Sequence, residues 1–178
     1  MRKLKNSELN RIDISTFKSI KKTPLIIILN DVRSLNNIGS IFRTSDAFLI
    51  EKIYLCGITA TPPNRKITKT ALGSTETVDW EHCDDIIELV NKLKLNGTKV
   101  WSVEQTENST TLEEIKQFEN FEKHALIFGN EINGIDQKVI NCSNEAIEIK
   151  QFGTKHSLNI SIAAGILIWH FFNLLRKN

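Results

Sequence analysis

The sequence lacks the residue patterns that mark several common kinds of functional site. It has three cysteines in 178 residues and no CxxC pair, which argues against a zinc site or a disulfide framework and fits a reducing cytoplasm. No GxGxxG or GxxxxGK[ST] pattern occurs, so a Rossmann dinucleotide site and a P-loop are disfavoured. The four histidines show no metal-ligand spacing with one another or with the cysteines. We therefore expect a cytoplasmic protein without a metal.

The patterns typical of a leader and of a membrane span are also missing from the sequence. The N-terminal stretch MRKLKNSELNR has no apolar core, and His170 and Asn173 interrupt the apolar C-terminal stretch. We expect neither a signal peptide nor a transmembrane helix. The length is typical of one domain, so we expect residues 1–178 to form a single domain with a short basic segment at residues 1–22.

Charge is distributed unevenly along the chain, although the net charge is only +2. Residues 1–22 hold seven basic and two acidic side chains, residues 60–75 hold three basic and no acidic ones, and residues 76–122 are mainly acidic. This asymmetry indicates a basic face for a polyanion such as RNA, with a solvated lysine-rich surface as the alternative. The candidate RNA-binding residues are Lys3, Lys5, Arg65 and Lys66.

Short apolar runs alternate with stretches of helical periodicity. This alternation predicts an α/β fold with a mainly parallel sheet and helices on both faces. Expected strands are Leu25–Leu29, Lys52–Leu55, Lys99–Val103, Ala125–Phe128 and Ala146–Ile149, with a weaker candidate at Thr77–Trp80. Expected helices are Ser7–Ser19, Gly39–Phe48, Asp84–Lys94, Asp136–Asn141 and Asn159–Arg176. Ligands of such sheets bind beyond the carboxyl ends of strands, which directs attention to the segments after Leu29, Val103, Phe128 and Ile149.

The first of these segments is LNDVRSLNNIGSIFRTSDAF, residues 29–48. Asn36 or Asn37 is expected to cap a helix that begins near Gly39. Arg43 lies in a helix whose other residues are expected to be mostly buried, so we expect it to have an anionic partner or to face a site. An internal ion pair is the structural alternative.

Two further segments have small and polar residues at strand ends. In LIFGNEINGID, residues 126–136, a glycine at the strand end would let a ligand approach the backbone closely, although a plain turn is the alternative. In EIKQFGTKHSLNISIAAGILIW, residues 148–169, Ser157 and Asn159 stand at the start of a long helix, where they could bind a ligand or simply cap the helix.

Taken in this order, NNIGSIFRTSDAF, IFGNEINGI and GTKHSLNISIAAGI resemble motifs 1, 2 and 3 of the SpoU/TrmH family of RNA ribose methyltransferases. The resemblance extends over roughly Leu25 to Leu175. It implies a SPOUT fold with a C-terminal trefoil knot, a feature that is rare in proteins. It also implies methyl transfer from S-adenosylmethionine to a ribose 2′-hydroxyl of structured RNA, either tRNA or rRNA, by a homodimer.

The resemblance assigns roles to particular residues. The implied catalytic residues are Asn37, Arg43, Glu131, Ser157 and Asn159. The implied cofactor contacts are Thr106, Gly129, Asn130, Ile149, Gln151 and Leu158. One departure from the family pattern is Lys150, where relatives commonly have proline.

Two physical arguments bear on these implied properties: one concerns whether Arg43 can act as a base, and the other concerns the dimer. An arginine guanidinium has a pKa above about 12, so using it as a base near neutral pH would cost roughly 7 kcal/mol. A phosphate clamp that orients the hydroxyl is therefore our preferred role for Arg43.

The helix expected at Asn159–Arg176 is apolar around most of its circumference, so another subunit or the chain's own N-terminal helix should cover it.

Three other functions are compatible with parts of this pattern. The same fold could bind RNA without catalysis, which the complete set of polar motif residues argues against. Other SPOUT enzymes methylate bases, but the Ser-Leu-Asn stretch favours ribose. An unrelated α/β enzyme for a small molecule is disfavoured by the basic segments and by the missing nucleotide-binding motifs.

Overall fold

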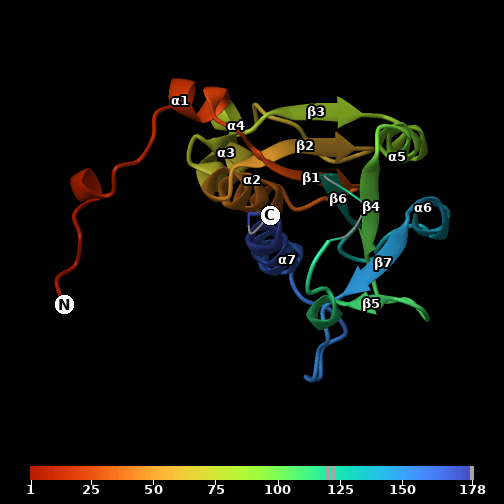
Figure 1. Ribbon diagram of the computed structural model, residues 1–178. Coiled ribbons are helices and arrows are strands. Elements are labelled where there is room, and N and C mark those ends of the chain that lie inside the picture. The colour runs from red at the N-terminus through yellow and green to blue at the C-terminus, as the bar shows by residue number, and fades with distance from the viewer. Residues whose placement is uncertain (119–120, 122, 177–178) are drawn as a thin grey trace.

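A computed structural model describes residues 1–118, 121 and 123–176 of the chain. These residues form a seven-stranded parallel sheet with the strand order β3-β2-β1-β6-β4-β7-β5 (Figure 1). The strands are β1 Thr23–Asn30, β2 Ile50–Cys56, β3 Trp80–Cys83, β4 Thr98–Val103, β5 Thr110–Thr111, β6 Lys123–Phe128 and β7 Glu145–Glu148. The predicted α/β fold with a parallel sheet is confirmed.

The strand predictions were accurate where the apolar runs are long. All five main predicted strands overlap observed ones. The weaker candidate Thr77–Trp80 was wrong, because Thr77 ends a short helix and β3 begins only at Trp80. The two-residue strand β5 was missed, since two residues are too few to show an alternation.

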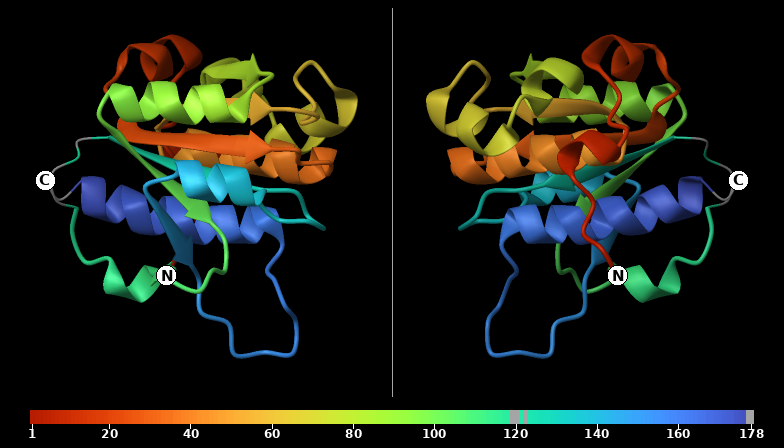
Figure 2. Two further views of the ribbon diagram at one scale, coloured as in Figure 1. Left: turned by 90° about the vertical axis from the view of Figure 1, so that its right-hand side faces the viewer. Right: turned by 90° about the vertical axis from the view of Figure 1, so that its left-hand side faces the viewer.

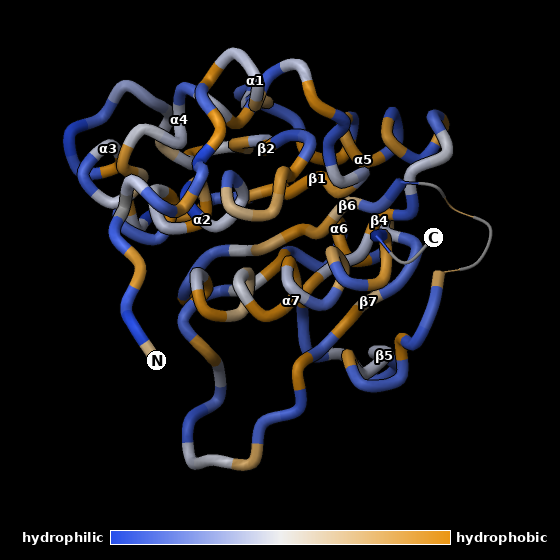
Figure 3. The backbone as a smooth tube through the Cα atoms, turned by 60° about the vertical axis from the view of Figure 1, so that its left-hand side comes forward, coloured by the Kyte–Doolittle hydropathy of each residue, from blue (hydrophilic) through white to orange (hydrophobic). Residues whose placement is uncertain are grey.

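Helices cover both faces of the sheet. Around α2 and α7, one apolar cluster packs against one face, and a second cluster packs α5 and α6 against the other (Figures 1 and 2). β1 and β6, at the centre of the sheet, are hydrophobic over most of their length (Figure 3). The helices are α1 Ile14–Ser19, α2 Leu35–Ala47, α3 Arg65–Ala71, α4 Ser74–Thr77, α5 Ile86–Leu95, α6 Gln137–Cys142 and α7 Ile160–Leu175, with 3-10 turns η1 Asn6–Glu8 and η2 Leu112–Glu114.

The predicted N-terminal helix Ser7–Ser19 is confirmed only over its second half, where α1 ends at the predicted residue. The chain instead forms η1, a connecting stretch and α1. Asn10 in that stretch has a left-handed backbone with φ 46°, which interrupts a right-handed helix. Asp13 then caps α1 by accepting a hydrogen bond from the backbone N–H of Thr16 at 2.7 Å. Figure 1 shows the chain before α1 extending away from the sheet.

Helix α2 begins four residues earlier than predicted. Its cap is Ser34, whose hydroxyl accepts a hydrogen bond from the backbone N–H of Asn37 at 3.3 Å. Asn36 and Asn37, the predicted caps, therefore lie inside the first turn. The side chain of Asn37 is left free for another partner.

Residues 65–71, for which the sequence predicted no helix, form α3, which packs closely on α2. A Cβ atom at Gly39 of α2 would lie 2.4 Å from the carbonyl oxygen of Ile67 and 2.0 Å from the hydroxyl of Thr70. Only glycine permits this approach. The close packing makes α2 and α3 one unit beside the site described below.

Helix α7 is the longest helix of the described chain. Asn159 caps it by accepting a hydrogen bond from the backbone N–H of Ser161 at 2.9 Å, so the cap is Asn159 and not Ser157. Of the helices in the described residues, none is long and apolar enough to cross a membrane.

Candidate active site

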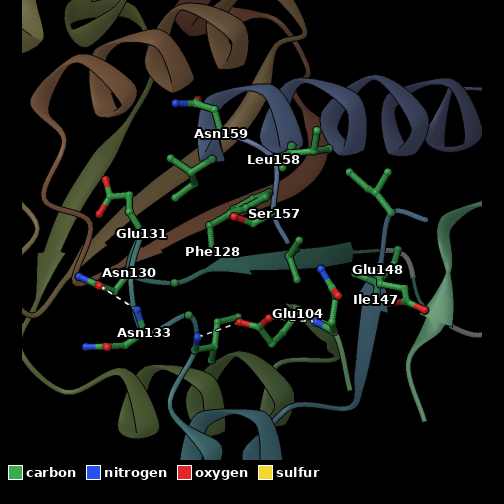
Figure 4. Close-up of a pocket in the computed structure, with 18 of the residues that line it drawn as sticks. Glu104, Phe128, Asn130, Glu131, Asn133, Ile147, Glu148, Ser157, Leu158 and Asn159 are labelled. Atoms are coloured by element: carbon green, nitrogen blue, oxygen red, sulfur yellow. Dashed lines mark hydrogen bonds between the residues drawn. The ribbon is translucent and has the colours of Figure 1, made fainter. Parts of the chain in front are cut away.

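A cavity of about 520 Å³ opens beyond the carboxyl ends of β4, β6 and β7, next to the start of α7. This is the edge to which the strand-end rule pointed. Figure 4 shows Asn130 and Glu131 on one side of the cavity, Ile147 and Glu148 on the other, and Ser157 between them. Its lining includes six large apolar side chains: Phe128, Ile135, Ile147, Ile149, Leu158 and Ile160.

The cavity brings together most of the residues predicted for the site. Eight of them line it: Gly129, Asn130, Glu131, Ile149, Gln151, Ser157, Leu158 and Asn159. Thr106 does not line it, because β4 ends at Val103 and the two residues that follow, Glu104 and Gln105, take that place. The functional roles of the eight residues remain predictions.

The second motif folds into a tight loop at the end of β6. Asn130 and Gly134 exchange two backbone hydrogen bonds at 2.9 and 3.0 Å. The Asn130 side chain accepts hydrogen bonds from the backbone N–H groups of Ile132 and Asn133. A Cβ atom at Gly129 would lie 2.4 Å from the backbone of Gly134. Glycine is therefore needed at this strand end because the backbone of Gly134 leaves no room for a side chain. This requirement exists whether or not a ligand also approaches Gly129.

Glu131 ties this loop to the turn just before the first motif. Its carboxylate accepts hydrogen bonds from the backbone N–H groups of Arg33 and Ser34 at 3.0 and 2.9 Å. Partial burial raises the pKa of Glu131. The two backbone N–H groups and the side chain of Asn37 lower this pKa by a larger amount, so the net pKa lies below its usual value. The carboxylate is held as a charged acceptor, which is the arrangement of a positioning group.

A chain of polar contacts continues from the first motif to the third. The side-chain amide of Asn159 donates a hydrogen bond to the side-chain oxygen of Asn37 at 3.2 Å. Since Asn37 also interacts with Glu131, residues from all three predicted motifs form one connected cluster. The sequence predicted these residues individually but not their contacts.

Glu104 is a site residue that the sequence reasoning missed. Its carboxylate accepts a hydrogen bond from the backbone N–H of Ile135 at 3.0 Å and packs against Gly134 (Figure 4). It thereby holds the far end of the second-motif loop against the end of β4. An acidic residue directly after a buried strand was the available signal.

Arg43 lies outside the cavity. It is exposed on α2, and it makes no ion pair with any residue that the structure describes. The alternative prediction, an internal ion pair of Arg43, is therefore wrong for the residues that the structure describes. Arg43 is therefore an exposed cation without an ion pair among the described residues, and it is not a member of the cavity wall.

Comparison with known proteins identifies the family. The model of the SpoU rRNA Methylase family matches residues 24–169, most of the chain. The chain belongs to the SpoU rRNA methylase family. The predicted resemblance is thus confirmed, and the match includes all three SpoU motif segments.

Two curated relatives of this SpoU chain have named RNA substrates. It is 30% identical over 145 residues to the 23S rRNA (guanosine(2553)-2′-O)-methyltransferase RlmP of Bacillus subtilis, covering 82% of this chain and 56% of that protein. It is 25% identical over 150 residues to the tRNA (guanosine(18)-2′-O)-methyltransferase of Aquifex aeolicus, covering 84% of this chain and 69% of that protein. The SpoU chain thus spans little more than half the length of the first relative.

Solved structures share the fold of this SpoU chain. The A. aeolicus TrmH/SpoU tRNA modifying enzyme matches with a TM-score of 0.79 at 21% identity, over 92% of this chain and 81% of that one. An AdoMet-bound rRNA methyltransferase from Sinorhizobium meliloti matches with a TM-score of 0.78 at 23% identity, over 88% of this chain and 59% of that one.

Proposed function

We propose that this SpoU-family chain transfers a methyl group from S-adenosylmethionine to a ribose 2′-hydroxyl of structured RNA, either tRNA or rRNA. The observation that carries the proposal is the polar cluster of Glu131, Asn37 and Asn159, which joins the three family motifs at the edge of one cavity. The activities named for the relatives, 2′-O-methylation of 23S rRNA and of tRNA, support it.

The cavity fits this cofactor chemically. Its apolar walls suit an adenine ring, and its lining includes three carboxylates, Glu104, Glu131 and Glu148. No lysine or arginine is present among the described residues that line it. Such a site favours a positively charged ligand, and the cofactor, when bound, supplies a methyl group activated on a sulfonium centre. We propose that Gly129, Asn130, Ile149, Gln151 and Leu158 hold it, without a metal.

The chain's own contribution to the reaction is positioning. It must hold the ribose hydroxyl in line with the methyl group and help to remove its proton. We propose that Ser157 and Asn159 orient the ribose, while Glu131 and Asn37 hold the second-motif loop against the first motif. The guanidinium of Arg43 clamps an adjacent phosphate and orients the hydroxyl. The hydroxyl proton is lost late, to a water molecule, with help from that phosphate.

We propose further that the active unit is a homodimer with shared sites. The structure leaves Ile162, Ile166 and Trp169 on one face of α7 at 56%, 38% and 54% exposure. Helix α1 packs near α4 and leaves this face of α7 uncovered, so the chain's own N-terminal helix is not the cover. A second copy would bury the face. It would also bring its own Arg43 to a cavity that lacks one.

We also propose that α7 is threaded through the chain as the trefoil knot of the SPOUT fold. Two described residues of the connection between β4 and β6, Ile115 and Phe118, lie against α7, which supports this. The backbone carbonyl of Ile115 is 2.8 Å from the His170 ring, and the Phe118 and Phe171 rings lie 4.8 Å apart. The cytoplasmic location and the single domain at residues 1–178 stay predictions.

The deciding experiment maps ribose methylation by mass spectrometry in RNA from cells with and without the gene. One 2′-O-methyl group should disappear with the gene and return when purified protein and S-adenosylmethionine are added to the unmodified RNA. RNA binding without methyl transfer would instead support a non-catalytic RNA-binding protein. Methylation of a base would instead indicate the base-methylating activity of other SPOUT enzymes.

A further inference from the structure

Arg33 presents an unpaired guanidinium beside the cavity, at a position to which no role has been assigned above. Its side chain is exposed, and it makes no hydrogen bond or ion pair with any part of the chain that the structure describes. The neighbouring carboxylate, Glu131, uses its two oxygens for backbone N–H groups. The charge of Arg33 is therefore available to a partner outside the chain.

The backbone that carries Arg33 is held firmly on both sides. The N–H of Val32 donates to the hydroxyl of Thr59 at 3.0 Å, and that hydroxyl donates to the carbonyl of Leu29. The N–H groups of Arg33 and Ser34 both donate to Glu131. A side chain on such a rigid turn loses little backbone freedom on binding a ligand, which favours affinity.

The charges around this turn point to a phosphate as the partner. The cavity beside it is lined by carboxylates and, within the described residues, by no cation, so it would repel the RNA backbone at its mouth. The stretches at positions 32–45 and 57–75, which contain most of α2 and all of α3, have by contrast no acidic residue, and the carboxylates of the flanking Asp31 and Asp46 accept hydrogen bonds from Ile58 and Thr77. The exposed cations of these stretches are Arg33, Arg43, Arg65, Lys66 and Lys69. Arg33 is the one whose backbone is bonded to a residue of the cavity wall.

We propose that Arg33 binds a backbone phosphate next to the target nucleotide and thereby positions the ribose at the mouth of the cavity. This inference rests on the proposed function, because it assumes that RNA is the substrate. Guanidinium groups bind phosphate oxygens in a bidentate manner. The contact would draw the RNA towards the cavity despite the carboxylates in its wall.

The test compares RNA binding by the wild type, Arg33→Ala and Arg33→Lys across a series of salt concentrations. The probe is protein-free 23S rRNA or bulk tRNA, whichever the wild type methylates. Arg33→Ala should weaken RNA binding about tenfold at low salt and reduce the slope of log Kd against log salt by about 0.7–0.9, the value for one lost phosphate contact. Arg33→Lys should keep the slope, because it keeps the charge. A purely structural role would not change the slope.

A matched control separates this contact from a general loss of charge. Lys138→Ala removes an exposed cation on α6, on the opposite face of the sheet, and should leave RNA affinity unchanged. Cofactor affinity and thermal stability should be the same in all variants. Unchanged RNA affinity and slope in Arg33→Ala, with a wild type that methylates the RNA, would overturn the inference. A wild type that methylates neither RNA would overturn the proposed function instead.

Discussion

The carboxylate of Glu131 accepts a hydrogen bond from the backbone N–H of Ser34, the residue that caps α2, at 2.9 Å. The two residues are 97 positions apart in the chain. Glu131 comes from the second family motif, and Ser34 lies two residues before the start of the first. Together with the bond from Arg33, this contact decides where α2 begins relative to the cavity. The role of Glu131 is therefore best tested through the backbone it holds.

The first prediction concerns Glu131→Ala. The change removes the charged acceptor of the N–H groups of Arg33 and Ser34, which water can partly replace because both hydrogen bonds are exposed, so the free energy of unfolding should fall by about 1 kcal/mol. Hydrogen exchange at these two amides should become faster, and methyl transfer should fall with it. Glu148→Ala is the matched control for stability and hydrogen exchange, because Glu148 lines the same cavity but accepts no hydrogen bond from the described residues through its side chain. Protected Arg33 and Ser34 amides in Glu131→Ala would contradict the positioning role.

The second prediction compares two glycines near the proposed cofactor. A Cβ atom at Gly129 would lie 2.4 Å from backbone atoms of Gly134, whereas a Cβ atom at Gly153 would meet no heavy atom within 4 Å. Gly129→Ala should therefore distort the second-motif loop and weaken S-adenosylmethionine binding more than tenfold, about 1.4 kcal/mol. Gly153→Ala should bind within a few-fold of the wild type. Calorimetry measures both, and equal affinities would mean that the loop does not form the cofactor site.

The third prediction tests the shared site by complementation. Arg43→Ala and Gly129→Val are each expected to be inactive alone. If Arg43 serves the cavity of the partner subunit, half of the dimers formed on co-expression are mixed and each has one intact site. About a quarter of wild-type activity should then return, assuming random pairing in a two-fold dimer. Each variant co-expressed with itself is the control, and no recovery in the mixed sample would place Arg43 with the cavity of its own subunit.

The fourth prediction concerns the pH dependence of stability. Burial, helped by the positive charge of Lys99, lowers the pKa of His124 to about 4, so the folded protein keeps this ring neutral. The unfolded chain binds a proton near pH 6.5, and stability should therefore fall by about 3 kcal/mol as the pH drops from 6.5 to 4. Above pH 6.5 the ring is neutral in both states and the loss disappears.

Urea unfolding between pH 4.5 and 7 measures this dependence. His124→Gln keeps an acceptor for the Trp101 indole N–H, which lies 3.1 Å from the ring nitrogen of His124, and should show a shallower pH dependence than the wild type. His82→Gln removes an exposed histidine and should match the wild type. The same slope in His124→Gln would show that other groups carry the acid sensitivity.

The sequence by itself determined the class of fold and the edge of the sheet that holds the site. Apolar runs such as Leu25–Leu29 and Ala125–Phe128 are long enough to be strands buried on both faces. Polar and glycine residues directly after them, such as Gly129 and Glu131, mark the carboxyl ends of those strands. The ordered motifs then identified the family, because such a combination rarely arises by chance.

Only the tertiary structure decided which of these residues touch. Asn37 and Asn159 are 122 positions apart, and no local pattern encodes their hydrogen bond. The cap of α2 depends on Ser34, whose position Glu131 supports from a distant loop. The break at Asn10 and the close packing of Gly39 on α3 were equally hidden. Local propensity reflects the nearest few residues along the chain, whereas the site is assembled by contacts between segments that meet only when the sheet forms.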